Sequence, residues 1–120
     1  PTGSLDLDGN TKYDALSDGM LLVRSMFGLE GDVLINGSIA SDAAYISSTD
    51  ILNRIELLGD LRDIDGNGDI DALTDGLLVV RHLFGLEGEA LIAGVIAENA
   101  TRVTAAEIEI YLEILAPEIQ

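Results

Sequence analysis

The sequence predicts an all-α domain built from two tandem repeats, each arranged as a loop, a helix, a short connector and a second helix. Two observations support this fold class. Segments 5–43 and 62–100 align without a gap at an offset of 57 residues, and 23 of the 39 aligned pairs are identical. Over the next 17 pairs only 3 are identical, and there a helical spacing of apolar residues carries the likeness. We therefore expect four main helices, short helical turns, and a pseudo-two-fold relation between repeats 5–60 and 62–117.

The composition suits a single domain, residues 1–120, with a core of Leu, Ile, Val and Ala. Hydrophobic residues make up 48% of the chain but aromatic residues only 4%, and Cys and Trp are absent. No apolar run approaches the roughly 18 residues needed to span a bilayer, so we expect no membrane insertion. The chain begins PTGSLDLDGN without an initiator Met, which leads us to expect a piece of a longer protein.

The first helix of each repeat is predicted from apolar residues at i, i+4, i+7 and i+11, which form one stripe. The stripes are Leu16, Met20, Val23 and Phe27, and Leu73, Leu77, Val80 and Phe84. We expect Phe27 and Phe84 to pack in the core. Gly28 and Gly85 follow directly, where a left-handed glycine would end each helix.

The second helix of each repeat begins at a capping-box signal, Ser47 with Asp50 and Thr104 with Glu107. Apolar stripes follow, consisting of Ile51, Ile55 and Leu58, and of Ile108, Leu112 and Leu115. Short helical turns are expected between the two helices of each repeat, near 33–36 and 90–93. We expect no strand beyond one or two residues in each acidic loop.

The charge is strongly acidic, with 22 acidic residues against 6 basic ones and a net charge of −16. Nucleic acids and anionic membranes are bound by basic patches, so this balance excludes both as expected partners. It favours cations instead. Scattered glutamates are explained by solubility, whereas the clustered aspartates need a separate account.

The aspartates cluster in DIDGNGDIDALTDG, residues 63–76. With Asp63 as position 1, oxygen-bearing residues fall at positions 1, 3, 5, 7 and 9, which is the spacing of an EF-hand calcium loop. The predicted ligands are Asp63, Asp65, Asn67, the backbone carbonyl of Asp69, and Asp71, and in the first repeat Asp6, Asp8, Asn10, the backbone carbonyl of Lys12, and Asp14. Lys12 occupies the position where no side-chain ligand is needed. A polar turn without metal would explain the composition, but like charges this close repel unless neutralised, and the spacing occurs twice.

Positions 6 and 8 of the loops predict a difference and a contact. The sharp turn at position 6 favours glycine, which Gly68 provides and Thr11 does not, so we expect the first site to be weaker or more distorted. Position 8 is apolar, with Ile70 and Tyr13, and is expected to bridge to the partner loop.

The closing acid of each loop is displaced by one residue. Position 12 is Ser17 or Thr74, and the acid follows at Asp18 or Asp75. If position 9 is the N-cap, Asp75 lies one turn on, on the same side of the helix, and could still close the site. The position 9 aspartates are open to either reading, cap or ligand. Gly19 and Gly76 come next and predict close approach of another backbone.

These features resemble dockerin, a calcium-binding duplicated module. The resemblance covers 6–29 and 63–86, including DxDGN, the apolar eighth position and the xxLLxxR helix that carries Arg24 and Arg81. It implies two calcium ions, metal-coupled folding, and attachment of a larger secreted bacterial protein to a cohesin-like or other extracellular receptor. Arg24 and Arg81 are the candidate contact residues. The chain departs from the family in its displaced acid, in the residues at positions 10 and 11, and in its longer repeat.

The alternative to a docking module is a calcium-stabilised spacer or terminal domain without a dedicated partner. An intracellular calcium sensor fits less well, because sensors usually carry Glu at position 12. Catalysis has little support: GxSxG and GxxxxGK motifs are absent, and His82, aligned with Ser25, suits a surface or packing role. We therefore expect no enzyme activity. Zinc would require His or Cys, and magnesium prefers a tighter octahedron that retains water.

Overall fold

A computed structural model describes residues 3–116, so position 117, the end of the predicted second repeat, lies outside the described residues. The structure is all-helical, which confirms the predicted fold class. The helices are α1 (Met20–Met26), α2 (Asp32–Ile35), α3 (Ser48–Leu58), α4 (Leu77–Leu83), α5 (Gly88–Ile92) and α6 (Ala105–Leu115), with π-helical turns η1 (Ala15–Gly19) and η3 (Ala72–Gly76) and a 3₁₀ turn η2 (Gly59–Arg62). Residues 3–116 contain no strand, which agrees with the expectation of at most one or two strand residues in each acidic loop.

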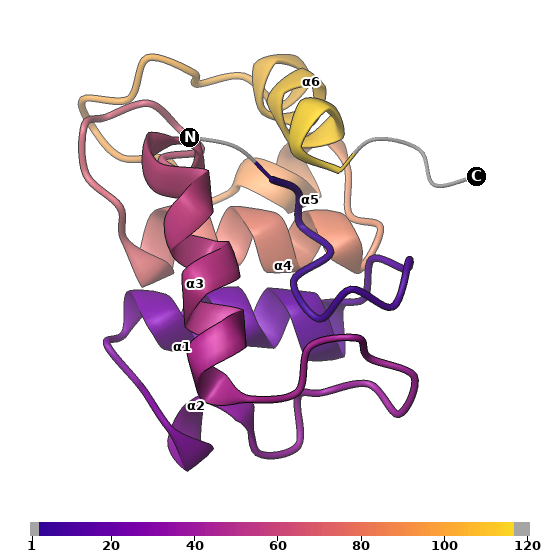
Figure 1. Ribbon diagram of the computed structural model, residues 1–120. Helices are drawn as coiled ribbons and strands as arrows, with labels where there is room; N and C mark the ends of the chain where they lie inside the picture. Colours follow the sequence, from indigo (N-terminus) through magenta and orange to yellow (C-terminus); the bar gives the residue numbers. More distant parts are fainter. Residues whose placement is uncertain (1–2, 117–120) are drawn as a thin grey trace.

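The two repeats meet along their first helices. Figure 1 shows α1 and α4 side by side in the middle of the molecule, with α3 crossing in front and α6 beyond α4. The turn η1 packs against α4, and η3 packs against α1. A Cβ added to Gly19 would lie 3.7 Å from Cα of Val80, and one added to Gly76 would lie 3.8 Å from Cα of Val23. The predicted close approach of another backbone at both glycines is confirmed.

The core is aliphatic, as the composition predicts, but its face on the first helices differs from the predicted stripe. Leu21 and Leu22, with Leu78 and Val79, are fully buried. The side chains of Phe27 and Phe84 are each 59% exposed, and those of Leu16 and Leu73 are 63% and 61% exposed. The prediction that both phenylalanines pack in the core is therefore wrong. A stripe drawn at 3.6 residues per turn assumed a regular helix from its start, whereas each first helix begins with a π-helical turn that shifts the face.

The helix ends follow the predicted signals with one difference. Gly28 and Gly85 have φ of 84° and 88°, which confirms the left-handed ends. Thr104 and Glu107 form the full capping box. Ser47 accepts the N–H of Asp50 at 3.2 Å, but the described contacts include no reciprocal bond from the Asp50 side chain. Asp is one methylene shorter than the Glu or Gln of the motif, which explains the missing half.

Each acidic loop lies next to the C-terminal end of the second helix of the other repeat. Loop 63–71 continues from α3 through η2 in the chain. The first loop is joined to the other end of the chain, since the N–H of Leu5 donates to the carbonyl of Leu115 at 3.0 Å. Among the described helices, none has the length and apolar character needed to cross a membrane.

Candidate metal centres

Each repeat gathers three aspartates into one cluster. Carboxylate oxygens of Asp6, Asp8 and Asp18 all lie within 4.8 Å of one another, and those of Asp63, Asp65 and Asp75 do the same. The first member of each set is half-buried, and the other two are buried. Two groups of carboxylates that could hold a metal ion are thus present at equivalent places in the repeats.

The displaced acid reaches the loop because the first turn of the helix is wide. The N–H of Gly19 donates to the carbonyl of Asp14 at 3.1 Å, five residues back, and Gly76 does the same to Asp71. A π-helical turn accommodates one more residue than an α turn. The extra residue that separates Asp18 from position 12 is absorbed there, so its carboxylate faces the loop.

Asp18 and Asp75 also organise the loop backbone. Oδ1 of Asp18 accepts the N–H of Leu7 at 2.8 Å and that of Asp8 at 3.4 Å, while its Oδ2 accepts the N–H of Asp14 at 3.0 Å. Asp75 makes the same three bonds, at 2.7, 3.3 and 2.8 Å, to Ile64, Asp65 and Asp71. One carboxylate therefore ties loop positions 2, 3 and 9 together in each repeat.

Several oxygens in these regions are buried without a hydrogen-bond partner. They are Oδ1 of Asp6, Oδ1 of Asp8, Oγ of Ser17, Oδ1 of Asp65 and Oγ1 of Thr74. Native proteins satisfy the large majority of buried polar side-chain atoms, so each exception requires an explanation. The carboxylate oxygens belong to the predicted ligands. The hydroxyls of Ser17 and Thr74 were not predicted as ligands, and their position 12 in an EF-hand spacing was the available signal.

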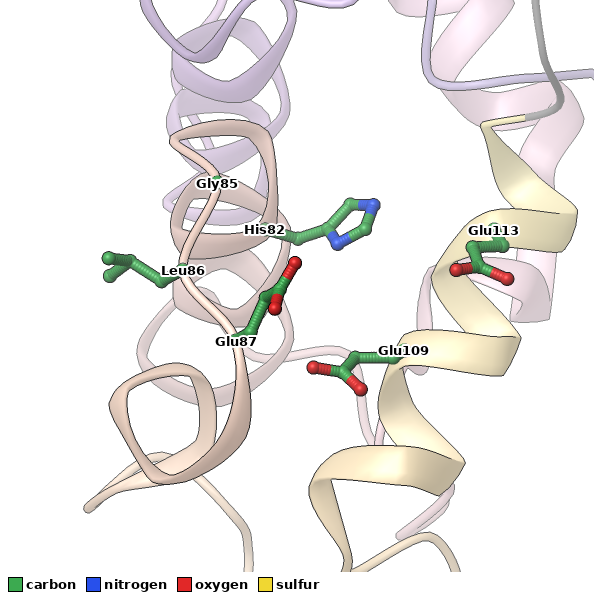
Figure 2. A pocket seen from close by; sticks show the side chains of 6 residues that line it. All are labelled: His82, Gly85, Leu86, Glu87, Glu109 and Glu113. Atoms are coloured by element: carbon green, nitrogen blue, oxygen red, sulfur yellow. The ribbon is translucent and has the colours of Figure 1, made fainter.

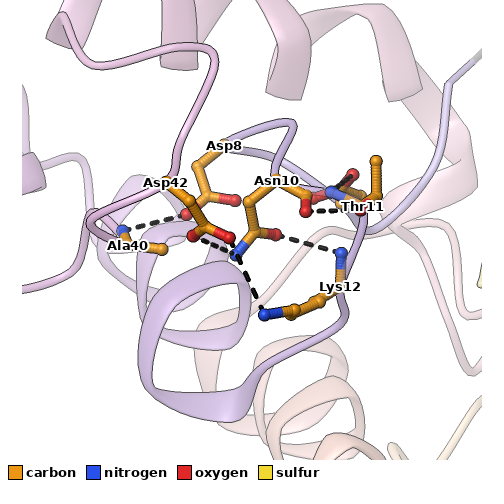
Figure 3. Close-up of polar contacts among 7 residues, drawn as sticks. Asp8, Asn10, Thr11, Lys12, Ala40 and Asp42 are labelled. Atoms are coloured by element: carbon orange, nitrogen blue, oxygen red, sulfur yellow. Dashed lines mark hydrogen bonds and ion pairs between the residues drawn. The ribbon is translucent and has the colours of Figure 1, made fainter.

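The connector after α2 or α5 covers one side of each loop. Oδ2 of Asp8 accepts the N–H of Ala40 at 3.0 Å (Figure 3), and the carbonyl of Asp8 accepts the N–H groups of Ala44 and Tyr45. In the second repeat Oδ2 of Asp65 accepts the N–H of Ala97 at 2.9 Å. One oxygen of each buried aspartate is thus held by the connector, and the other is left for the cluster.

The predicted asparagine ligands contact both their own loop and the connector that covers it. Oδ1 of Asn10 accepts the N–H of Lys12, and its Nδ2 donates to Asp42, which also pairs with the Lys12 ammonium at 3.7 Å (Figure 3). Oδ1 of Asn67 accepts the N–H of Asp69. Each asparagine thus accepts an amide two residues further on, in a turn of its loop.

Asp14 and Asp71 are the N-caps of η1 and η3. Their Oδ1 atoms accept the N–H groups of Leu16 and Leu73, each at 2.8 Å. Both are exposed, and neither belongs to a three-carboxylate group. Of the two readings left open by the sequence, the cap is therefore the role that these contacts show.

Position 6 has the same backbone shape in both loops despite the different residues. Thr11 has φ of 67° and Gly68 has φ of 91°. The N–H of each donates at 2.9 Å to Oδ2 of the position 1 aspartate, Asp6 or Asp63. A β-branched residue at positive φ is strained, so position 6 makes the same bond to the position 1 aspartate in both loops but differs between them in backbone strain. Position 8 does not bridge the loops by a β-pair, since residues 3–116 contain no bridge.

Two of the buried aspartates, Asp18 and Asp75, have raised pKa values. Burial raises the pKa of Asp18 to about 7, and the nearby Asp8 carboxylate adds to the rise, while backbone N–H donors oppose it. Burial likewise raises the pKa of Asp75 to about 6, with further contributions from Asp65 and Asp63. Removing water from a carboxylate disfavours its charged form, so a bound cation would relieve this cost.

The basic residues do not neutralise the clusters. Every arginine donates to main-chain carbonyls: Arg24, Arg54, Arg62, Arg81 and Arg102. The ion pair found among residues 3–116 is the exposed one between Lys12 and Asp42. An uncompensated buried charge costs several kcal/mol. The donor set is made entirely of oxygens, which fits a hard divalent cation.

Arg24 and Arg81, the predicted contact residues, cap the short helices of their own repeats. Nη1 of Arg24 donates to the carbonyls of Leu34 and Asn36 at 3.0 and 2.7 Å. Nη1 of Arg81 donates to those of Leu91 and Ala93 at 3.2 and 2.8 Å. Helix C-termini leave carbonyls without intrahelical partners, and the arginines satisfy them.

His82 lines a surface pocket between the end of α4 and α6, together with Glu87, Glu109 and Glu113 (Figure 2). Burial lowers the pKa of His82, against the opposing effect of the three glutamates. Glu109 accepts the N–H of Gly88 at 3.1 Å. These side chains do not form a further three-ligand metal group among the described residues.

Comparison of the chain with family models, with curated proteins and with solved structures found no match. The fold and the site define this protein as a helical domain with two acidic clusters, each able to hold a metal ion.

Proposed function

We propose that this chain is a dockerin-like module that binds two calcium ions and attaches a larger secreted bacterial protein to an extracellular receptor. The observation that supports metal binding is the set of buried carboxylate oxygens without a hydrogen-bond partner on Asp6, Asp8 and Asp65. Each lies in a loop with EF-hand spacing, and the ion pair found among residues 3–116, between Lys12 and Asp42, involves none of them.

Calcium is favoured over other cations by the donor chemistry. It accepts six to eight oxygen ligands in flexible geometry, whereas magnesium demands a near-ideal octahedron. Zinc sites use nitrogen or sulfur donors, and neither three-carboxylate group contains His or Cys. When bound, the ion would supply the positive charge that the buried carboxylates of each cluster lack.

The attachment role is supported by exposed apolar side chains on the first helices. Leu16 and Phe27, and their counterparts Leu73 and Phe84, are each about three-fifths exposed. Exposed apolar side chains are the contacts that an interaction site uses, and these four lie at the two ends of the η1–α1 and η3–α4 segments. Because they recur in both repeats, the module would present two similar faces to a receptor of the cohesin type.

Isothermal titration with calcium tests the metal claim, and extracellular modules of this kind bind at roughly 0.1 to 1 mM. We expect two ions per chain. Asp65→Asn should abolish one of them, and Asp69→Asn, which changes an exposed side chain in the same loop, should leave both. At 10 mM calcium each site should add about 1 to 3 kcal/mol to the free energy of unfolding. Absence of heat and of any calcium-dependent stabilisation would refute the proposal.

A second candidate function is a calcium-stabilised spacer without a dedicated partner. The observation that favours it is the capping role of Arg24 and Arg81, which occupies the basic side chains expected at a docking surface. Capture of secreted proteins from the source organism separates the two. Partners retained with calcium and released by chelator support docking, provided that Phe27→Asp combined with Phe84→Asp abolishes retention. Retention that persists in this double variant, or no retention by the unmodified module, favours the spacer.

A further inference from the structure

An arginine stacked on a tyrosine holds the start of the first acidic loop. Arg54 extends from α3, and its Nε donates to the carbonyl of Leu7 at 2.9 Å while its Nη2 donates to that of Asp6 at 2.7 Å. The guanidinium carbon lies 4.2 Å from the ring centroid of Tyr45. The two carbonyls are those of loop positions 2 and 1, and the position 1 residue, Asp6, is a proposed ligand.

The second repeat has the same arrangement with the two residues exchanged. Arg102 donates from Nε to Ile64 and from Nη2 to Asp63, both at 2.7 Å, and its guanidinium carbon lies 3.8 Å from the ring centroid of Tyr111. In the alignment at offset 57, Arg102 corresponds to Tyr45, and Arg54 corresponds to Tyr111. In the first repeat the guanidinium comes from the second helix, α3, and in the second repeat it comes from the connector before α6, yet it bonds the carbonyls of the same two loop positions. We call each Arg–Tyr pair a clasp.

Each clasp also contacts the glycine at loop position 4. Gly9 and Gly66 have φ of 71° and 70°. A Cβ on Gly9 would lie 2.7 Å from the ring of Tyr45, and one on Gly66 would collide with the hydroxyl of Thr101 and lie 3.3 Å from Arg102. The clasp therefore fits closely over the part of the loop that lies between the position 3 and position 5 residues.

The exchange shows which property of the clasp matters. Identity at these positions is lost between the repeats, yet the fork of two bonds to the same carbonyls is retained. Arg presents donors in a rigid planar fork and stacks on aromatic rings, which a Lys ammonium cannot reproduce. Because the guanidinium contacts carbonyls rather than carboxylates, its effect on the cluster acts through backbone position.

We infer that Arg54 and Arg102 are positioning residues that preorganise the two loops for calcium. This inference rests on the proposed function. By fixing the carbonyls of positions 1 and 2, each clasp sets the direction in which the position 1 and position 3 carboxylates leave the backbone. It also links each metal loop to the second helix of its own repeat, because either Arg or Tyr is supplied by α3 or α6.

The test is a calcium titration followed by NMR of the full chain, with the backbone amides of Thr11 and Gly68 reporting the first and second site. Each amide donates to the position 1 aspartate of its loop. Groups that orient metal ligands typically contribute 10 to 100-fold in affinity, so Arg54→Gln should weaken the first site about tenfold or more. The second site should change by less than about twofold, since the sites share no ligand.

Two further variants separate geometry from charge and from folding. Arg54→Lys keeps the charge but loses the fork, and we expect it to be nearly as weak as Arg54→Gln. The double exchange Tyr45→Arg with Arg54→Tyr rebuilds the clasp in the orientation of the second repeat and should restore most of the affinity. If Arg54→Gln reduces the helical circular dichroism, Tyr45→Leu, which keeps the guanidinium, replaces it in the comparison.

The outcomes are distinguishable. No calcium response at either amide of the unmodified chain refutes the proposed function and this inference with it. A normal response that Arg54→Gln leaves unchanged or strengthens refutes the inference alone, as does full rescue by Arg54→Lys. Loss in Arg54→Gln with recovery in the double exchange supports it, provided that both variants keep the helical circular dichroism of the unmodified chain.

Discussion

Position 6 is Thr11 in the first loop and Gly68 in the second, so each residue can be replaced by the other. The backbone conformation determines whether each replacement raises or lowers the free energy of unfolding. Thr11 and Gly68 occupy the same left-handed region, at φ of 67° and 91°. No atom lies within 4 Å of a Cβ added to Gly68, so a side chain there meets open space. The Thr11 hydroxyl donates to the carbonyl of Asn10 at 2.6 Å, but this bond is exposed. We therefore expect the energetic difference between Gly and Thr at this position to come mainly from φ.

The magnitude follows from two opposing effects. An L residue in the left-handed region costs about 1 to 2 kcal/mol, whereas the greater freedom of glycine in the unfolded chain costs about 0.5 to 1 kcal/mol. Thr11→Gly should thus raise the free energy of unfolding by about 0.5 to 1 kcal/mol, and Gly68→Thr should lower it by a similar amount. In a domain of this size, such changes move Tm by about 2 to 5 °C in opposite directions.

The assay is urea unfolding followed by helical circular dichroism, with chelator present so that metal binding does not contribute. Thr11→Ala is the control, because it removes the β-branch and hydroxyl but keeps a Cβ at positive φ, and it should stay near the unmodified protein. Two results would show that backbone strain does not determine the stability difference at this position. One is an unchanged urea midpoint for Gly68→Thr, and the other is a gain in the free energy of unfolding for Thr11→Ala as large as that for Thr11→Gly. Repeating Thr11→Gly with calcium tests whether strain weakens the first site, which stays a prediction.

Three further predictions follow from buried groups. The pKa values of Asp18 and Asp75 are raised to about 7 and about 6, so in metal-free protein the folded state binds more protons than the unfolded state between about pH 4 and 7. The free energy of unfolding should therefore fall as pH rises through this range. Asp18→Asn should flatten this pH profile when it is measured by urea unfolding, and an unchanged slope would contradict the assignment. Gly76→Ala should destabilise by about 1 to 3 kcal/mol, because the new methyl would lie 3.0 Å from Cγ2 of Val23, and a thermal melt equal to that of the unmodified protein would show that the helices can separate without cost. Ser17→Ala should leave the metal-free protein equally stable or slightly more stable, since it removes a buried hydroxyl without a partner, and a clear loss in chelator would mean that the hydroxyl has one.

Much of the local structure is readable from the sequence because it depends on neighbouring residues. Gly28 and Gly85 end their helices as expected, and Thr104 with Glu107 forms its capping box. The Asp14 cap likewise follows from a side chain that bonds an amide two residues on. Such contacts involve few residues, so their spacing identifies them.

The exposed phenylalanines and the inward aspartates show where local reading fails. Phe27 and Phe84 were assigned to the core by a regular 3.6-residue period, which the π-helical turns η1 and η3 interrupt. The same turns bring Asp18 to its cluster despite its displacement by one residue. The width of one turn is decided by packing and by distant hydrogen bonds, which a periodic pattern does not include.

The sequence by itself determined that the molecule is a helical duplication with two acidic loops of EF-hand spacing, because repetition, alternation and helix caps are properties of the chain. Only the tertiary structure decided which oxygens stay without partners and which backbone atoms the arginines hold. The exchange of Arg54 and Tyr45 into Tyr111 and Arg102 looks like loss of likeness in the alignment, yet the guanidinium occupies the same place. Hydrogen bonding depends on where a group lies in space, and two positions nine residues apart on adjoining segments can supply the same group.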